Sequence, residues 1–258
     1  MRSPPDRFDL YELCVQSPKD LAPLLRAIHG GKPRTLGEDF SGTAALSHEW
    51  VEADPQARAI ATDLDPEALD RHARHDRIVK LARDVRAVND PCDVLFVGNF
   101  SIGYLHTRGE LVEYLRHALR RINQGGAFVC DTYGGESAFL LGSVHRPHPM
   151  PGGRICRYTW EQRHADPTTG MVTDVIHFRV ERAGVIEHEI MDAFVYEWRL
   201  WSVPELRDAM AEAGFRQTQV YAKLADAMDD EGNAYVEPVM DAESELDESF
   251  IVLVVGRV

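Results

Sequence analysis

The chain has 258 residues, of which 44% are hydrophobic and 27% charged, and its formal net charge is −14 at pH 7. This composition is that of a globular protein and excludes fibrous and intrinsically disordered classes. The acidic excess repels phosphate backbones on average, so we expect no nucleic-acid partner.

The four cysteines, Cys14, Cys92, Cys130 and Cys156, are far apart and form no Cys-x-x-Cys pair. This spacing argues against a zinc site and against a disulfide framework, and we expect no metal. The first ten residues contain arginine, aspartate and two prolines where a signal peptide would need an apolar run. No later stretch is long enough to span a bilayer, so we expect no membrane partner and a reducing, cytoplasmic location.

The first half of the chain has the pattern of a parallel α/β sheet. Leucines and alanines at helical spacing follow Ser17 and predict a leading helix that ends at Gly30. Short strand-like runs then alternate with helical patterns, which is typical of a parallel sheet. The predicted strands cover residues 34–38, 57–63, 78–84, 93–98 and 127–131, and the predicted helices cover residues 44–53, 66–77 and 108–122.

A different pattern follows between residues 134 and 199. Residues 134–153 are rich in glycine, proline and histidine and predict a loop with a short helix at 137–141. Strand-like runs at 154–163, 171–181 and 186–199, joined by turn-rich segments at 166–170 and 183–184, predict a small antiparallel sheet.

The parallel pattern resumes near the carboxyl end. The expected elements are a helix from 202 to 213, a strand at 216–221, an exposed acidic loop at 226–248 and a last strand at 250–255. The predicted fold is α/β, a Rossmann-like, doubly wound, seven-stranded and mostly parallel sheet whose last strand is antiparallel, with an inserted antiparallel β lid. Residues 1–140 and 200–258 would form one domain, and residues 141–199 would form the insert, as a substrate lid or a dimer contact.

Ligands of an open parallel sheet bind beyond the carboxyl ends of its strands, so the residues that follow each strand are the candidate site. Gly42 lies in the turn after the first strand, where it lets the backbone approach a ligand, or serves a plain packing turn. Asp63 closes the second strand about twenty residues later, where a carboxylate can accept both hydroxyls of a ribose. Asp84 follows the third strand and could accept a proton from an adenine amino group. Taken singly, Asp63 and Asp84 would also suit surface turns, but three such residues in register favour a nucleotide-like ligand.

This series resembles the class I S-adenosylmethionine-dependent methyltransferases, whose first loop begins Asp/Glu-x-Gly-x-Gly-x-Gly. Glu38 matches the acidic residue and Gly42 the middle glycine, whereas Phe40 and Ala44 stand where the first and third glycines would be. The segments 124–128 and 212–215 resemble the family's turns into the fifth and sixth strands, and the last strand resembles its extra antiparallel strand.

The resemblance implies S-adenosyl-L-methionine as the cofactor and a role for each matching residue. Glu38 would organise the first loop, Asp63 would hold the ribose, and Asp84 with Val85 would border the adenine. The full set of implied cofactor-binding residues is Tyr11, Glu38, Phe40, Ser41, Gly42, Asp63, Leu64, Asp84, Val85, Asn99 and Phe100. Tyr11 is included because it resembles the amino-terminal aromatic residue that closes over the cofactor in related enzymes.

The implied reaction is direct displacement of the methyl group by a nitrogen or oxygen nucleophile of a small molecule, for which geometry matters more than any universal catalytic residue. A hydroxyl acceptor usually needs a base, and the candidate catalytic residues His106, Asp131 and Tyr133 follow the fourth and fifth strands. Each of them also suits a plain structural role, as helix entry, strand end or pocket lining.

Two features of the insert bear on the substrate. The basic residues His145, Arg146, His148, Arg154 and Arg157 could attract a carboxylate or phosphate on the substrate, or simply be solvated. The alternating aromatic residues could line a substrate lid, contribute to a homodimer contact or form a hydrophobic face; they are Tyr158, Trp160, Phe178, Phe194, Tyr196 and Trp198.

Other functions stay open at this point. A regulatory protein could retain the cofactor pocket without chemistry, an option that the loss of two loop glycines supports. A nicotinamide-dependent oxidoreductase is a weaker alternative because no Gly-x-Gly-x-x-Gly occurs. A nucleic-acid methyltransferase is disfavoured by the net charge and by Asn99-Phe100-Ser101-Ile102 after the fourth strand, where an Asn/Asp-Pro-Pro-Tyr/Phe-type tetrapeptide would be expected.

Overall fold

The computed structural model describes residues 4–229, 232–241 and 245–258. These residues divide into two compact units. Residues 17–138 and 201–258 form the unit that we call the Rossmann unit, and residues 4–16 and 139–200 form the insert unit. Within the described residues, no helix is both long and apolar enough to cross a membrane.

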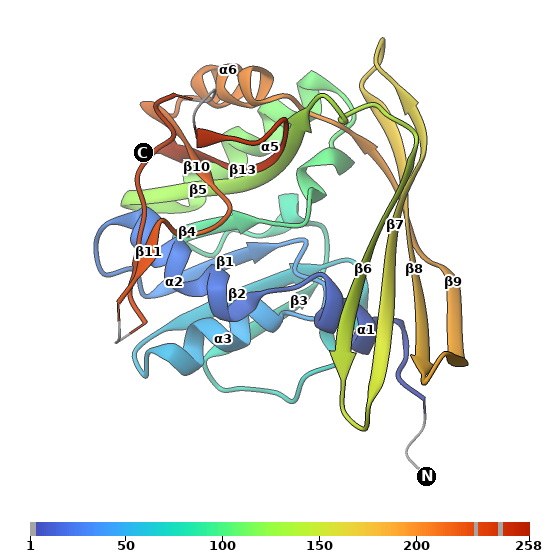
Figure 1. Ribbon diagram of the computed structural model, residues 1–258. Coiled ribbons are helices and arrows are strands. Elements are labelled where there is room, and N and C mark those ends of the chain that lie inside the picture. Colours follow the sequence, from blue (N-terminus) through green and yellow to red (C-terminus); the bar gives the residue numbers. More distant parts are fainter. Residues whose placement is uncertain (1–3, 230–231, 242–244) are drawn as a thin grey trace. The chain divides into compact units, whose positions relative to one another are not determined.

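The Rossmann unit is built on a seven-stranded sheet with the strand order β10-β13-β5-β4-β1-β2-β3 (Figure 1). Its strands are β1 (Thr35–Asp39), β2 (Arg58–Asp63), β3 (Ile78–Ala82), β4 (Cys92–Val97), β5 (Ile122–Gly135), β10 (Gln217–Ala222) and β13 (Ser249–Arg257). Strand β13 lies between β5 and β10 and runs antiparallel to both, while all other neighbours are parallel. The predicted doubly wound sheet with one antiparallel strand is confirmed.

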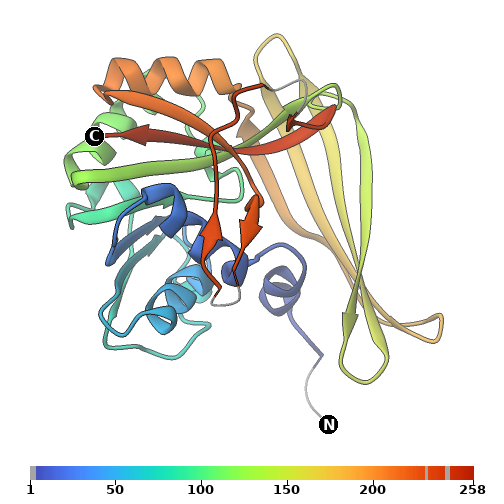
Figure 2. The same cartoon turned by 60° about the vertical axis from the view of Figure 1, so that its left-hand side comes forward.

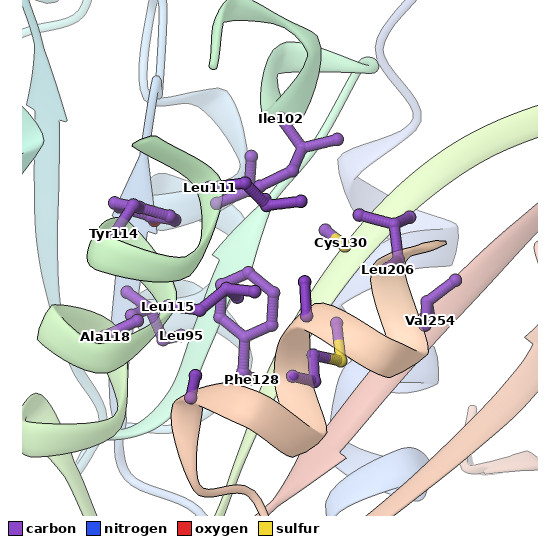
Figure 3. Packing of buried hydrophobic residues seen from close by; sticks show 14 of the residues in the cluster. Leu95, Ile102, Leu111, Tyr114, Leu115, Ala118, Phe128, Cys130, Leu206 and Val254 are labelled. Carbon is purple, nitrogen blue, oxygen red and sulfur yellow. The ribbon is translucent and has the colours of Figure 1, made fainter. Parts of the chain in front are cut away.

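Two helical layers cover this sheet because its strands are apolar on both faces. In β5, Phe128 and Cys130 face one hydrophobic cluster while Ala127 and Val129 face another. The first cluster joins the sheet to α5 (Arg108–Arg121) and α6 (Val203–Ala213), as Figure 3 shows for Leu115, Phe128 and Leu206. The second cluster joins it to α2 (Pro18–His29) and α3 (Ala45–Ala53).

One predicted helix is much shorter in the structure. The helix expected at residues 66–77 is α4 (Pro66–Leu69), which ends after a single turn. Residues 70–77 contain one apolar residue, Ala73, so they have no hydrophobic face with which a longer helix could pack. Instead, the Lys80 ammonium donates hydrogen bonds to the carbonyl oxygens of Leu69 and His72 and holds the irregular segment against β3.

The insert unit is a four-stranded antiparallel sheet in the order β6-β7-β8-β9, seen as the long yellow-green to orange strands of Figure 2. Its strands are β6 (Gly142–Met150), β7 (Arg154–Asp166), β8 (Met171–Arg182) and β9 (Val185–Arg199). The loop expected at 134–153 is therefore wrong in large part, and residues 136–139 form a turn where the helix at 137–141 was predicted. Two prolines, Pro147 and Pro149, argued against a strand here in the sequence. The structure accommodates them because β6 is an edge strand, where prolines are tolerated.

The amino-terminal helix α1 (Arg7–Cys14) belongs to the insert unit, whereas residues 1–140 were expected to lie in one domain with residues 200–258. Its buried Phe8 and Leu10 meet the aromatic face of the sheet, and the rings of Phe8 and Phe194 are 5.9 Å apart. The alternating aromatic residues of β7, β8 and β9 thus form a hydrophobic face that a helix covers.

The acidic segment is only partly irregular. Two short strands, β11 (Ala227–Met228) and β12 (Ala234–Tyr235), form an antiparallel ribbon within it. Residues 230–231 and 242–244 of the predicted loop lie outside the described residues.

Candidate active site at the carboxyl edge of the sheet

The turn after β1 adopts a backbone that normally requires glycine. Phe40 has φ 58°, Gly42 φ 54° and Ala44 φ 61°, all in the left-handed region. A left-handed conformation costs a residue with a side chain about 1–2 kcal/mol. Phe40 and Ala44 occupy the places of two family glycines and still have the backbone conformation that glycine favours.

Glu38 holds this turn to the start of α3. Its Oε2 accepts hydrogen bonds from the Ser47 backbone N–H at 3.0 Å and from the Ser47 hydroxyl at 2.5 Å. Ala44, at the N-cap of α3, has no polar side chain that could cap the helix. The Glu38 carboxylate instead accepts a hydrogen bond from one of the first N–H groups of α3. Burial raises the pKa of Glu38 to about 7, although both Ser47 bonds favour the ionised form.

We expect the unfolding free energy of the ligand-free protein to fall between about pH 4.5 and pH 7 because of Glu38. A carboxyl with a raised pKa holds its proton in the folded state after the unfolded chain has released it, so rising pH favours unfolding. At ~1.4 kcal/mol per pKa unit, a rise from 4.5 to about 7 corresponds to a loss of roughly 3 kcal/mol. Chemical denaturation across this pH range should show the decrease in the wild type and a flatter profile in Glu38→Gln. Parallel profiles for the two proteins would contradict the assignment.

Asp63, at the end of β2, connects the second strand to the first turn. Its Oδ2 accepts the Gly42 N–H at 2.7 Å, and its Oδ1 accepts the Asp65 N–H at 2.9 Å. Burial raises its pKa, against the opposing effect of these backbone hydrogen bonds. A further backbone hydrogen bond comes from Leu64, so three of the about four acceptor sites of the carboxylate are used and one remains for a hydroxyl donor.

The residues that follow Asp63 and β3 differ in exposure. Leu64 is 72% exposed, whereas Val85 is buried. Asp84 caps the short 3-10 helix η1 (Val85–Ala87), and its carboxylate is paired with Arg86 at 2.6 Å, which holds the pKa of Asp84 below its usual range. Asp84 therefore has a structural role at this edge, and its contact with the adenine stays a prediction.

The loop after β4 is strained in the same way as the loop after β1. Asn99 has φ 53° and Phe100 φ 62°, two consecutive left-handed residues that are not glycine. The Asp131 carboxylate, fully buried at the same edge of β5, accepts the N–H of Phe100 at 2.7 Å and of Asn99 at 3.0 Å. Strained backbone of this kind persists where its surroundings over-determine it and is frequent at functional sites.

Lys223 completes this cluster. Its ammonium lies 2.8 Å from Asp131 Oδ2 and 5.4 Å from the centre of the Phe100 ring. The Tyr133 ring packs edge-on against Phe100 at 4.9 Å. His106, in contrast, is exposed at the entry to α5, next to the N-cap Thr107.

Contacts connect the two loops along the carboxyl edge. Phe40 stacks on Tyr104 of the 3-10 helix η2 (Ser101–Tyr104), with the ring centres 5.9 Å apart. The buried Ser41 lies between Phe40 and Gly42, and its N–H donates to the Thr62 carbonyl. The side-chain hydroxyls of Ser41 and Thr62 are buried with no hydrogen-bond partner in the described structure, which is uncommon for buried polar groups.

Sequence reasoning missed two groups here. Lys223 directly follows β10, so it could have been found in the sequence as a residue that follows a strand of the sheet. The buried ion pair of Asp39 with Arg121 lies beneath the first turn and involves residues 82 positions apart, for which the sequence carries no local signal. Among the described residues, no group of three histidine, cysteine, aspartate or glutamate side chains is arranged to hold a metal ion.

The predicted residues of the insert unit are arranged differently from expectation. Tyr11 lies on α1 with its ring 4.9 Å from that of Phe194, and its role in cofactor binding stays a prediction. Of the predicted basic patch, His145, Arg146 and Arg157 line a hollow together with Glu161 and His177, and His148 lies opposite Cys156 in the register of β6 and β7. Arg157 is also neutralised by Glu181 at 2.6 Å.

No protein-family model and no curated protein matches the sequence. Solved structures, however, match it along nearly its whole length. The sugar N-methyltransferase KedS8 from Streptoalloteichus is 18% identical, with a TM-score of 0.66 over 100% of this chain and 96% of its own. CalS10 from Micromonospora echinaspora, an amino pentose methyltransferase solved with S-adenosylmethionine bound, is 17% identical, with a TM-score of 0.65 over 96% and 95% of the two chains.

The CcbJ methyltransferase from Streptomyces caelestis is similar at 17% identity, with a TM-score of 0.61 over 94% of this chain and 96% of its own. The chain therefore has the fold of S-adenosylmethionine-dependent methyltransferases, including the inserted antiparallel sheet.

Proposed function

We propose that this chain is an enzyme that transfers the methyl group of S-adenosyl-L-methionine to a small molecule by direct displacement. The observation that carries the proposal is the bond from the Gly42 N–H to Asp63 at the carboxyl edge of the sheet. It joins the turn that would cradle the methionine part to the carboxylate that would hold the ribose. Phe40 and Ala44 adopt a left-handed backbone despite the missing glycines, which favours a working cofactor site over a degenerate one.

In this proposal the residues along the edge bind consecutive parts of the cofactor. Glu38 supports the turn, Ser41 and Gly42 face the methionine part, and Asp63 accepts the ribose hydroxyls. Leu64, Asp84 and Val85 border the adenine, and Asn99 with Phe100 lies by the methionine end, where the reactive sulfonium would be. The exposed Leu64 gives the adenine an apolar surface to cover.

The acceptor that we propose is an amino group on a sugar-like molecule. KedS8 and CalS10 are described as sugar N- and amino pentose methyltransferases, and they match both the Rossmann unit and the insert. A neutral amine attacks without a base once it has lost its extra proton, so an exposed His106 and a structurally engaged Asp131 are compatible with the reaction. Tyr133, whose ring contacts Phe100, is then the candidate proton acceptor if the acceptor group is a hydroxyl.

The insert would form a substrate lid or a dimer contact. The hollow lined by His145, Arg146 and Arg157 has a cavity volume of about 540 Å³, and the Arg146 guanidinium could attract an anionic group on the acceptor. The cytoplasm is the proposed location, in keeping with four cysteines without a disulfide.

The test is a methyl-transfer assay with the purified chain and labelled S-adenosylmethionine. We expect label to appear on amino sugars and not on the matched sugars in which a hydroxyl replaces the amine. Labelling of the hydroxyl sugars alone would overturn the acceptor class. Tight binding of S-adenosylhomocysteine without transfer to any acceptor in a broad panel would favour the silent regulatory alternative, and binding of a nicotinamide dinucleotide in its place would favour an oxidoreductase.

A further inference from the structure

Two cysteines that are far apart in the sequence lie side by side in the insert unit. Cys14 is the last residue of α1, and Cys156 lies in the inner strand β7. The Cys14 thiol donates a hydrogen bond to the Cys156 sulfur, with the two sulfurs 3.5 Å apart. Cys156 is fully buried on the apolar face of the sheet, and Cys14 is partly exposed at the edge of the same cluster.

We propose that Cys14 and Cys156 form a redox modification site, which a peroxide converts into an intramolecular disulfide between α1 and β7. A disulfide needs a sulfur–sulfur distance of about 2.05 Å, so the two atoms must approach by roughly 1.5 Å. Cys14 ends a helix of eight residues, which makes its side chain the one that can shift. The proposal is independent of the methyl-transfer function.

The chemistry requires only the two thiols and one peroxide molecule. The partly exposed Cys14 sulfur attacks the O–O bond, which gives a sulfenic acid and releases one water. The Cys156 sulfur then attacks the Cys14 sulfur, the S–S bond forms, and the sulfenic hydroxyl leaves as a second water with the proton of Cys156. Two thiols and hydrogen peroxide thus give one disulfide and two waters.

The hydrogen bond between the two thiols shifts their pKa values in opposite directions. The hydrogen bond from Cys14 lowers the pKa of the Cys156 thiol, which makes Cys156 the better resolving nucleophile. The same hydrogen bond, together with burial, raises the pKa of Cys14. We therefore expect the formation of the sulfenic acid, rather than its resolution, to limit the rate.

The other two cysteines provide an internal control. Cys92 and Cys130 are completely buried in the sheet of the Rossmann unit, where burial raises the pKa of Cys92 to about 12 and that of Cys130 well above its usual value. The pKa of Cys14 is raised as well, so the difference lies in access: peroxide reaches the partly exposed Cys14 but not two completely buried thiols. They should remain reduced under conditions that oxidise the Cys14–Cys156 pair.

The experiment treats the full wild-type chain with a small excess of hydrogen peroxide and measures its intact mass before and after reduction with dithiothreitol. We expect the loss of two hydrogen atoms, its reversal by dithiothreitol, and a digest in which the peptides of Cys14 and Cys156 are joined. Cys156→Ser should instead accumulate a sulfenic acid on Cys14 that dimedone traps, and Cys92→Ser should behave as the wild type.

Several results would overturn the proposal. These are an unchanged mass, a gain of oxygen on Cys14 in the wild type without a crosslink, or a crosslink that includes Cys92 or Cys130. Because the decisive measurement uses the wild-type chain, a folding defect in a cysteine variant would not obscure it.

Discussion

Replacing Arg121 with methionine is expected to lower the unfolding free energy by about 3–5 kcal/mol, because it leaves a buried carboxylate without its counter-charge. Arg121 Nη1 donates to both oxygens of Asp39, at 2.7 and 3.1 Å, and the two side chains are 1% and 0% exposed. The Tyr114 hydroxyl adds a third bond to Asp39 at 2.8 Å. Burial raises the pKa of Asp39, and the Arg121 guanidinium opposes that rise, so the variant should also take up a proton on folding.

The matched control for Arg121→Met is Arg120→Met, on the preceding residue of α5 but exposed. We expect this control to change the unfolding free energy by less than about 0.5 kcal/mol. The double variant Asp39→Asn/Arg121→Met should recover part of the loss, because it removes both charges rather than one. Urea unfolding of the four proteins would measure these differences, and an Arg121→Met variant as stable as its Arg120 control would contradict the account.

Asp131→Ala is expected to slow methyl transfer on the order of 100-fold, because Asp131 holds the loop at the proposed reaction centre. Without the carboxylate, the N–H groups of Asn99 and Phe100 lose their acceptor and two left-handed residues lose their restraint. A displacement of about 1 Å at the reacting atoms can cost two orders of magnitude in rate. Steady-state kinetics with saturating cofactor would show the effect in kcat.

Two further variants separate this positioning role from proton transfer. Lys223→Met leaves both backbone hydrogen bonds to Asp131 in place, so we expect a decrease in kcat of roughly 10-fold or less. Asp131→Asn should lower kcat without changing the pH at which kcat falls to half. The reason is that a carboxylate which only holds the loop takes no proton from the substrate. If Asp131 were the base instead, the acidic limb of the kcat profile would disappear in Asp131→Asn.

The sequence was most informative where strands are buried on both faces. The apolar runs of β1, β2, β4 and β13, and the capping signals at Thr107 and Asp65, have local causes, so they could be recognised without a structure. The carboxylates at Glu38, Asp63 and Asp84 could be placed because parallel strands end at one edge. What each carboxylate binds in the folded chain was not visible, and the pairing of Asp84 with Arg86 was not expected.

Other features escaped because they depend on contacts between distant residues. Strand β6 exists because it pairs with β7, despite two prolines and a mostly exposed surface. The helix at 66–77 was predicted from its start signal, but residues 70–77 contain a single apolar residue, Ala73, and so lack a hydrophobic face for a longer helix. The strained loops at Phe40 and Phe100 are held by Asp63 and Asp131 from other strands, and a sequence pattern cannot show such support.

The central claim is that the carboxyl edge of the Rossmann unit binds the adenosine of the cofactor through Asp63. Calorimetric titration of the purified chain with S-adenosylhomocysteine tests it most directly, in the wild type, in Asp63→Ala and in the neighbouring control Asp65→Ala. We predict one site in the wild type and about 10- to 100-fold weaker binding in Asp63→Ala, which corresponds to ~1.5–3 kcal/mol for lost hydrogen bonds to a charged group. Asp65→Ala should bind as the wild type does. A wild-type chain that takes up no S-adenosylhomocysteine, or an Asp63→Ala variant that binds it with unchanged affinity, would contradict the account.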